Sequence, residues 1–117
     1  MSKSKFVSTH NKGFQMTFEN GFRISVQWGI GNYCQRKEDG DFGDPRKTEF
    51  WESLSAEIAV FNTNNKMQEN SSVGMLSLGR DTVEGWVSAD QVAKVIAIVQ
   101  SSKTTEEIQQ KYKALNI

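Results

Sequence analysis

The strongest pattern in the sequence is an alternation of apolar and polar residues over residues 13–28. Successive side chains of a β-strand point to opposite faces, so this period of two predicts a pair of half-buried strands. Asn20-Gly21 separates the strands and suits a type I′ turn, because both central residues of that turn need positive φ. We therefore expect a β-hairpin with one face in water and one face on the core. The residues predicted to face the core are Phe14, Met16, Phe18, Phe22, Ile24, Val26 and Trp28.

Strand patterns recur in shorter segments further along the chain. Residues 55–61 alternate between an apolar face and a mixed one, and they predict a third strand. Residues 73–78 predict a fourth strand, and residues 83–87 predict a short fifth one. Between these segments the chain is polar and rich in glycine or asparagine, which is typical of loops.

Helical patterns appear only after the predicted strands. Ser88-Ala89-Asp90-Gln91 matches a capping box, in which the serine and glutamine side chains each bond the other residue's backbone amide. Apolar residues between Val92 and Val99 then follow helical spacing, and a second helix is expected from Thr104 onward. The apolar stripe of this second helix consists of Ile108, Tyr112 and Leu115.

Together these elements predict a fold of the α+β class. We expect a curved antiparallel sheet of roughly four to five strands, opened by an N-terminal β-hairpin and packed by C-terminal helices. The chain has 117 residues, of which 37% are hydrophobic, and this suits one compact domain over residues 1–117. Long polar loops are expected near residues 35–48 and 62–74.

The charge balance and the cysteine count narrow the classes of function. Lysine and arginine total 14 and so do aspartate and glutamate, so the formal net charge is zero. A general nucleic-acid binder usually carries a basic excess, so we do not expect nucleic acid as the partner. The single cysteine, Cys34, allows no intrachain disulfide. We read neither a secretory signal nor a membrane span, and we expect a cytoplasmic protein.

The glycine-containing segment Gly29–Cys34 is the first candidate for a binding site. Closely spaced glycines free backbone N–H groups to line a concavity that can hold an anion. The third glycine and the immediate helix of a dinucleotide-binding fingerprint are missing. Two interpretations therefore stay open. In the first, the glycines allow a sharp bend at the strand end. In the second, the segment forms part of a surface for a small ligand or a partner, built from Trp28, Asn32, Tyr33 and Arg36.

The tryptophans Trp28, Trp51 and Trp86 each lie at a predicted strand end or beside a loop. Tryptophan is rarely fully buried and is enriched at binding hot spots. We favour core packing for Trp28 and Trp86. For Trp51, which follows a charged segment, core packing and a surface that binds a partner are equally good interpretations.

Candidate catalytic and metal-binding groups are weak. Cys34 would need a base, and the only histidine, His10, could approach it only through the fold. The acidic residues between positions 38 and 44 lack the spacing of a calcium-binding EF-hand loop. Glu57 and Glu84 would have to share a pocket to act as a carboxylate pair, and exposed positions on a sheet are the simpler interpretation. We therefore expect no enzyme, no metal site and no cofactor.

Three segments of the sequence together carry a resemblance: FQMTFENGFRISVQWGIGNYC, AEIAVFN and EGWVSADQVAKVI. They resemble a family of uncharacterised small proteins of tailed bacteriophages. That family shows an aromatic-rich hairpin, a GxGNYC-like segment, a strand with the AEIA element and a helix introduced by a WVS-type cap. The resemblance implies a phage origin and brings no catalytic assignment.

These observations lead to two hypotheses of different classes. The first is a phage-encoded protein-binding module in the host cell cytoplasm, which modulates a host protein, for example in counter-defence. Trp51 and the loop around residues 39–47 are its expected contacts. The alternative is a protein that binds or sequesters a small, nucleotide-like ligand. Homo-oligomer formation through the last helix also stays open.

Overall fold

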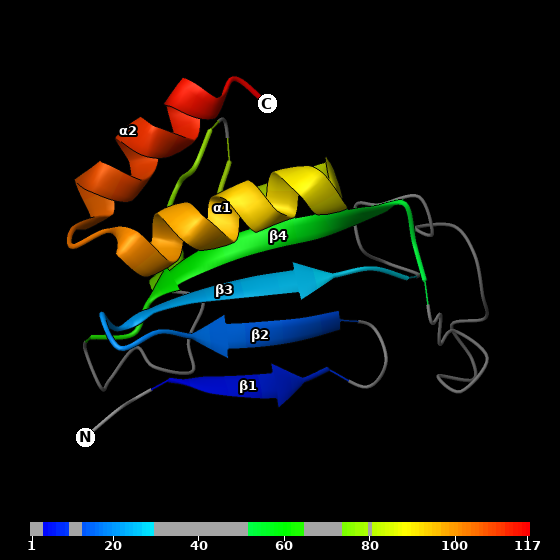
Figure 1. Ribbon diagram of the computed structural model, residues 1–117, viewed down its shortest axis with the longest axis horizontal. Coiled ribbons are helices and arrows are strands. Elements are labelled where there is room, and N and C mark those ends of the chain that lie inside the picture. The colour runs from blue at the N-terminus through cyan, green and yellow to red at the C-terminus, as the bar shows by residue number, and fades with distance from the viewer. Residues whose placement is uncertain (1–3, 10–12, 30–51, 65–73, 80) are drawn as a thin grey trace.

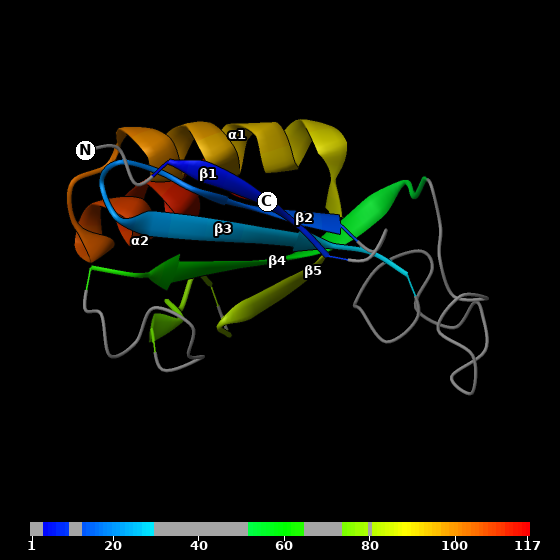
Figure 2. The same cartoon turned by 90° about the horizontal axis from the view of Figure 1, so that it is seen from below.

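The computed structural model describes residues 4–9, 13–29, 52–64, 74–79 and 81–117. They form a five-stranded antiparallel sheet whose strand order follows the chain, and helices cover one of its faces (Figures 1 and 2). This architecture confirms the predicted α+β class. The elements are β1 (Lys5–Ser8), β2 (Gly13–Thr17), β3 (Phe22–Gln27), β4 (Ser55–Asn62), β5 (Val83–Ser88), α1 (Ala89–Ser101) and α2 (Thr105–Leu115).

Two strands differ from the prediction. β1 precedes the hairpin and pairs with β2, although the sequence of this strand gave no pattern to predict it. Residues 73–78 were expected to form a fourth strand, but the described residues 74–78 do not form one. Met75 makes only an isolated bridge to Phe61. The Leu78 amide then donates to the Asp81 carbonyl at 3.3 Å, so the chain turns there instead of extending along the sheet.

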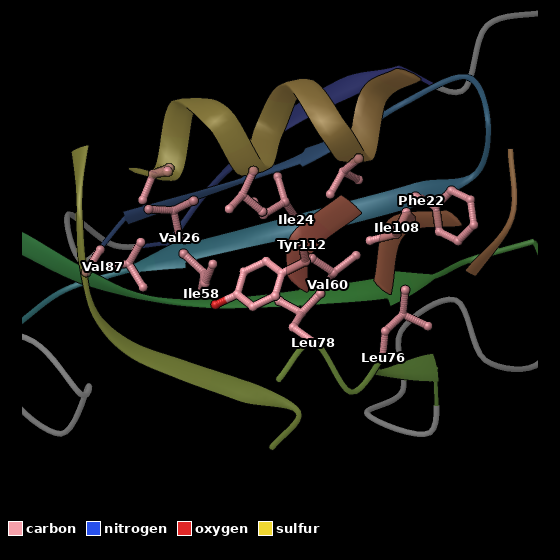
Figure 3. Close-up of a cluster of buried hydrophobic side chains, with 14 of the residues drawn as sticks. Phe22, Ile24, Val26, Ile58, Val60, Leu76, Leu78, Val87, Ile108 and Tyr112 are labelled. Atoms are coloured by element: carbon pink, nitrogen blue, oxygen red, sulfur yellow. The ribbon is translucent and has the colours of Figure 1, made fainter. Parts of the chain in front are cut away.

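The core lies between the sheet and the two helices. Alternate residues of β3 and β4 point toward the helices and are almost completely buried, and α1 packs against β3, β4 and β5. Each such side chain stabilises the fold by roughly 1.5–3 kcal/mol relative to an exposed one. The predicted inner face of the sheet and the predicted apolar faces of the helices are therefore confirmed. Figure 3 shows Ile24, Val26, Ile58, Val60, Leu78, Ile108 and Tyr112 in this cluster.

The outer face of the hairpin differs from the prediction that it lies in water. Thr17, Arg23 and Ser25 are on the face away from the helices and are nevertheless buried. The Arg23 Nε donates to the Thr17 Oγ1 at 2.9 Å, so these polar groups are paired within the buried face.

Both helices begin at capping residues, and the capping box predicted at Ser88 is confirmed. The Ser88 Oγ accepts from the Gln91 amide at 3.2 Å, and the Gln91 Oε1 accepts from the Ser88 amide at 3.0 Å. Thr104 caps α2 by accepting from the Glu107 amide at 3.1 Å. Within the part of the chain that the structure describes, neither helix is long and apolar enough to cross a membrane. Because Ser88 is the last residue of β5 and also the N-cap of α1, strand and helix join directly.

The hairpin turn differs from the predicted type I′ geometry. Gly21 has a positive φ of 87°, whereas Asn20 is not among the described residues with positive φ. The Gly21 amide donates to the Phe18 carbonyl, and the Phe18 amide donates to the Phe22 carbonyl, both at 2.9 Å. This is the pattern of a three-residue connection that ends in a left-handed glycine. The prediction was wrong because the Asn20 side chain is held by a distant element.

That distant element is the C-terminal end of α1. The Asn20 Nδ2 lies 2.8 Å from the Val99 carbonyl oxygen, 3.2 Å from that of Gln100 and 2.8 Å from that of Ser102. Carbonyls at the end of a helix have no partner within the helix, so the amide supplies the donors that they lack. Its Oδ1 accepts from the Phe22 amide at 3.0 Å. One side chain thus joins the hairpin to a helix about 80 residues later in the chain.

We expect the replacement of Asn20 by alanine to lower the free energy of unfolding by about 1–3 kcal/mol, because it removes the donors from several carbonyls, two of which are in partly buried bonds. Asn20→Asp should be at least as damaging, since a carboxylate would face the same carbonyls. Urea unfolding followed by circular dichroism measures the change. Glu19→Ala, at the exposed neighbouring position, is the control and should shift stability by less than about 0.5 kcal/mol. Equal stability of Asn20→Ala and the control would contradict this role.

Candidate functional site

An apolar cavity of about 400 Å³ lies between the N-terminal half of α1 and the sheet. Its walls come from four strands or their flanking residues and from the first turns of the helix. Most of the lining side chains are aliphatic or aromatic. The described residues that line it are Phe14, Val26, Trp28, Glu52, Ser53, Leu54, Ser55, Ala56, Val87, Ala89, Val92, Ala93 and Ile96.

The cavity exists because small residues meet large ones where the helix crosses the sheet. On the sheet, Phe14 pairs with Val26, and Ala56 pairs with Val87. On the helix, alanines precede and follow the buried Val92 and are too short to fill the space above these strands. A close-packed interior normally leaves few voids larger than a water molecule. A volume of this size at the surface is therefore available to a ligand or to a side chain of a partner.

Residues 52–55 form the mouth of the cavity. Leu54 is 77% exposed although it lines the cavity, so its side chain lies at the entrance. The Ser53 Oγ donates to the Ser55 carbonyl at 2.7 Å, which fixes the turn of the chain before β4. Glu52 is the only charged residue among the described lining residues. The site therefore suits a neutral apolar group better than an anionic one.

A strip of sheet continues from the cavity toward the β1 edge. Phe6 pairs with Met16 and Ser8 pairs with Phe14, so these four residues share the face on which the helices lie. Among the described elements, however, neither helix lies over β1 or β2 (Figure 1). Phe6 is 78% exposed, whereas Phe14 and Met16 are half-buried. We call this surface, formed by Phe6, Ser8, Phe14 and Met16, the open strip.

The structure places one of the residues predicted from the sequence as a binding site in this cavity. Trp28 lines the cavity and packs against the core, in agreement with the packing role favoured for it. The other predicted binding residues lie outside the described residues, and so do the candidate nucleophile, its candidate base and the acidic loop. These are Asn32, Tyr33, Arg36 and Trp51, together with Cys34, His10 and residues 38–44.

Trp86 does not pack in the core, contrary to the prediction. It is 59% exposed and has a positive φ of 53°. The register between β4 and β5 shifts between Ala56 and Ile58, so β5 holds one extra residue at this point. Such a bulge changes the direction of the strand and of the side chains on it. The left-handed conformation, which is rare for a large residue, accompanies this bulge.

The most informative residues of the cavity were not singled out as a site by sequence reasoning. Leu54 lies in a polar context, and the alanines of α1 looked like ordinary parts of an amphipathic helix. One signal was present: Ala89, Ala93 and Ala97 recur every four residues and so share one side of the helix. Their role depends on which strand lies opposite, and the sequence pattern does not specify that.

The two carboxylates considered as a catalytic pair point to opposite faces of the sheet. Glu84 pairs with Ile58 and shares its face toward the helices, while Glu57 precedes Ile58 and faces the other way. The Glu84 Oε1 is buried and has no hydrogen-bond partner among the described residues. No group of three or more histidine, cysteine, aspartate or glutamate side chains in the described ranges could hold a metal ion.

The Glu84 carboxylate affects the pKa of Tyr112. Burial raises the pKa of the Tyr112 phenol above its ordinary value of 10.0, and the negative charge of Glu84 raises it further. Both effects favour the neutral phenol, because a phenolate would lose hydration and face a like charge. Tyr112 belongs to α2 and packs in the core, and neither Tyr112 nor Glu84 is among the described residues that line the cavity.

Comparisons with known proteins add no relative to this description. No protein-family model matches the chain, and the searches of curated proteins and of solved structures return no match. The geometry of the described residues is therefore the basis of the functional argument.

Replacing Glu84 with glutamine should lower the pKa of Tyr112, because the like charge is removed, but leave that pKa above 10.0, because burial remains. The titration of tyrosinate absorbance, taken as the difference between each protein and its Tyr112→Phe counterpart, measures this pKa. The free energy of unfolding should depend on pH in a defined direction. The Tyr112 phenol ionises near its ordinary pKa of 10.0 in the unfolded chain, but only at a higher pH in the folded protein. Its contribution to the free energy of unfolding is therefore complete below pH 10.0 and is lost as the pH rises toward the raised pKa. An unchanged pKa in Glu84→Gln would contradict this coupling.

Proposed function

We propose that this chain is a protein-binding module that docks its partner on the apolar cavity and the open strip. The observation that carries the proposal is an apolar cavity of about 400 Å³ whose mouth and surroundings expose large apolar side chains. Residues that are depleted in charge and centred on a well-formed pocket are typical of the core of protein interfaces. The resemblance to small proteins of tailed phages supports a further part of the proposal, that the partner is a host protein whose activity is modulated.

The energetics favour a partner that covers both parts of the surface. Leu54 at the mouth and Phe6 on the open strip are each more than three quarters exposed, at 77% and 78%. Burying an apolar side chain of this size contributes roughly 1.5–3 kcal/mol. A ligand confined to the cavity would leave Phe6 in water, whereas a partner protein can cover both residues. The distribution of apolar surface therefore supports a macromolecular partner.

A small neutral ligand is the second candidate. The cavity volume of about 400 Å³ falls within the range of small-molecule sites, roughly 300–1,000 Å³. Phe14 and Trp28 could stack against an aromatic ring. A nucleotide fits less well, because no lysine or arginine is among the described lining residues to pair with its phosphates. Native mass spectrometry of the purified protein would detect a ligand that co-purifies.

Replacing Ala93 with arginine should abolish partner binding without unfolding the protein. Ala93 lines the cavity but is exposed, so a long charged side chain there would block the site while its own end stays in water. The matched control is Ala114→Arg on α2, which is exposed and is not among the residues that line the cavity. The assay is capture from a bacterial host lysate by immobilised protein, with melting temperatures measured in parallel.

The expected result is a protein captured by the wild type and by Ala114→Arg and lost with Ala93→Arg, at unchanged melting temperature. Capture that is equal for the two variants would show that the cavity is not the docking site. A co-purifying small molecule lost in Ala93→Arg, with no captured protein, would favour the second candidate.

A further inference from the structure

We propose that the Asn20-Gly21 pair in the turn between β2 and β3 is a site of spontaneous deamidation, at which the Asn20 amide becomes a carboxylate once the end of α1 separates from the turn. The bonds that join this side chain to α1 then have two effects. They hold the helical layer on the sheet, and they protect the amide from attack by its own backbone. The inference does not depend on the proposed docking of a partner.

The sequence makes Asn20 the most reactive asparagine of the chain. Asparagine loses its amide when the backbone nitrogen of the next residue attacks the side-chain Cγ, and a side chain on that next residue hinders the attack. Glycine follows Asn20, whereas every other asparagine precedes a residue with a side chain. Glycine also gives the backbone the freedom that ring closure needs. In an unfolded chain, Asn20 should therefore react first.

The reaction needs water as its only co-reactant. The Gly21 nitrogen gives its proton to the solvent, and its lone pair forms a bond to the Asn20 Cγ. The Cγ–Nδ2 bond breaks, Nδ2 takes up a proton, and ammonia leaves behind a five-membered succinimide ring. Water then adds to one of the two ring carbonyls and opens the ring. The product is aspartate when the new Cγ–N bond breaks, and isoaspartate when the original peptide bond to Gly21 breaks.

In the folded protein the attacking nitrogen is held by the turn. The Gly21 amide donates to the Phe18 carbonyl at 2.9 Å. On the same peptide unit, the Asn20 carbonyl accepts from the Asn64 Nδ2 at 3.2 Å. The nitrogen must lose its proton and approach Cγ, so the attack removes the first bond and moves the peptide unit that makes the second. Both bonds therefore oppose ring closure.

The leaving group is held by the end of α1. The Asn20 Nδ2 lies within 2.8–3.2 Å of three carbonyl oxygens, those of Val99, Gln100 and Ser102. The Oδ1 of the same amide accepts from the Phe22 amide at 3.0 Å. Ring closure makes Cγ tetrahedral and expels Nδ2, so it requires that the bonds to the helix end break. Separation of the helix end removes them together and opens the route to the succinimide.

The modification removes the contact that protects the site. A carboxylate at position 20 has no N–H to donate, and its charge faces carbonyl oxygens at the negative end of the α1 dipole. Isoaspartate adds a backbone carbon to a turn whose bonds between Phe18 and Phe22 fit a three-residue connection. Either product weakens the docking of the helix end. A molecule that reacts therefore does not return to the original arrangement of its layers.

The test compares the rate of deamidation at Asn20 in the folded protein and in guanidinium chloride, at one pH and one temperature. Peptide mass spectrometry, with chromatography that separates aspartate from isoaspartate, measures the rate at each asparagine. Two variants distinguish local opening from global unfolding. Val99→Ala loosens the end of α1 that holds Asn20, whereas Val92→Ala makes the same change near the other end. Both valines are buried, and denaturant unfolding gives the stability of each variant as a reference.

We expect Asn20 to be the first asparagine to react in denaturant, and its rate to be lower in the folded wild type by roughly ten- to a hundredfold. Compared at equal free energies of unfolding, Val99→Ala should raise the folded-state rate more than Val92→Ala. Rates that follow only the free energy of unfolding would overturn the protection by α1, as would a folded wild type that reacts as fast as the denatured chain. An earlier reaction at another asparagine in denaturant would overturn the assignment of the site.

The consequence of the modification is tested on the product itself. Deamidated wild-type protein, separated from the intact protein by ion exchange, should have the lowered free energy of unfolding of Asn20→Asp. Full stability of the deamidated protein would overturn the inferred release of the helix end.

Discussion

The bonds from the Asn20 amide to the last carbonyls of α1 are the constraint on which the arrangement of the two layers depends. They hold the C-terminal end of the helix at the hairpin turn between β2 and β3. The other end of the helix is set by Ser88, which closes β5 and opens α1. A helix fixed at these two points lies over β3, β4 and β5, and it runs along β4 in Figure 1. The cavity and the open strip are the spaces that this path leaves uncovered.

This path gives the two faces of α1 different roles. Its valines face the sheet and are almost fully buried, and α2 packs on one flank. The opposite flank carries alanines and faces strands that have no helix above them in the described structure. Leaving apolar residues such as Phe6 in water gives up stabilisation that burial would provide. This exposed apolar surface beside a cavity is the feature on which the proposed docking rests.

The parts of the fold that the sequence predicted correctly are those set by local patterns. The alternation over residues 13–28 and the capping box at Ser88 each depend on a few neighbouring residues, and the two strands and the helix start that they predict appear in the structure. The burial of Arg23 and Ser25 on the outer face was not predicted, because it depends on what the rest of the chain places there. β1 was missed because its short sequence owes its conformation to pairing with β2. The turn type was wrong because the Asn20 side chain is held by the end of α1. The exposure of Trp86 likewise depends on a bulge against β4.

The residues of the candidate site likewise divide into those that a local pattern predicts and those that depend on the arrangement of distant elements. Trp28 was predicted because an aromatic residue at a strand end is informative in itself. Leu54 and Ala93 matter because of where the helix lies on the sheet, and the recurrence of alanines along α1 does not specify that position. The predicted binding residues Asn32, Tyr33, Arg36 and Trp51 remain predictions, because they lie outside the described residues.

The direct junction between β5 and α1 has a consequence for the thermodynamics of recognition. Since no linker separates the last strand from the helix, α1 cannot swing on a hinge at the end that borders the cavity. The wall of the cavity that α1 forms is therefore held in place by β5 before a partner arrives. The conformational entropy lost on association then falls mainly on the incoming molecule rather than on this domain. A partner that docks as proposed would therefore have to hold, or readily adopt, the complementary shape.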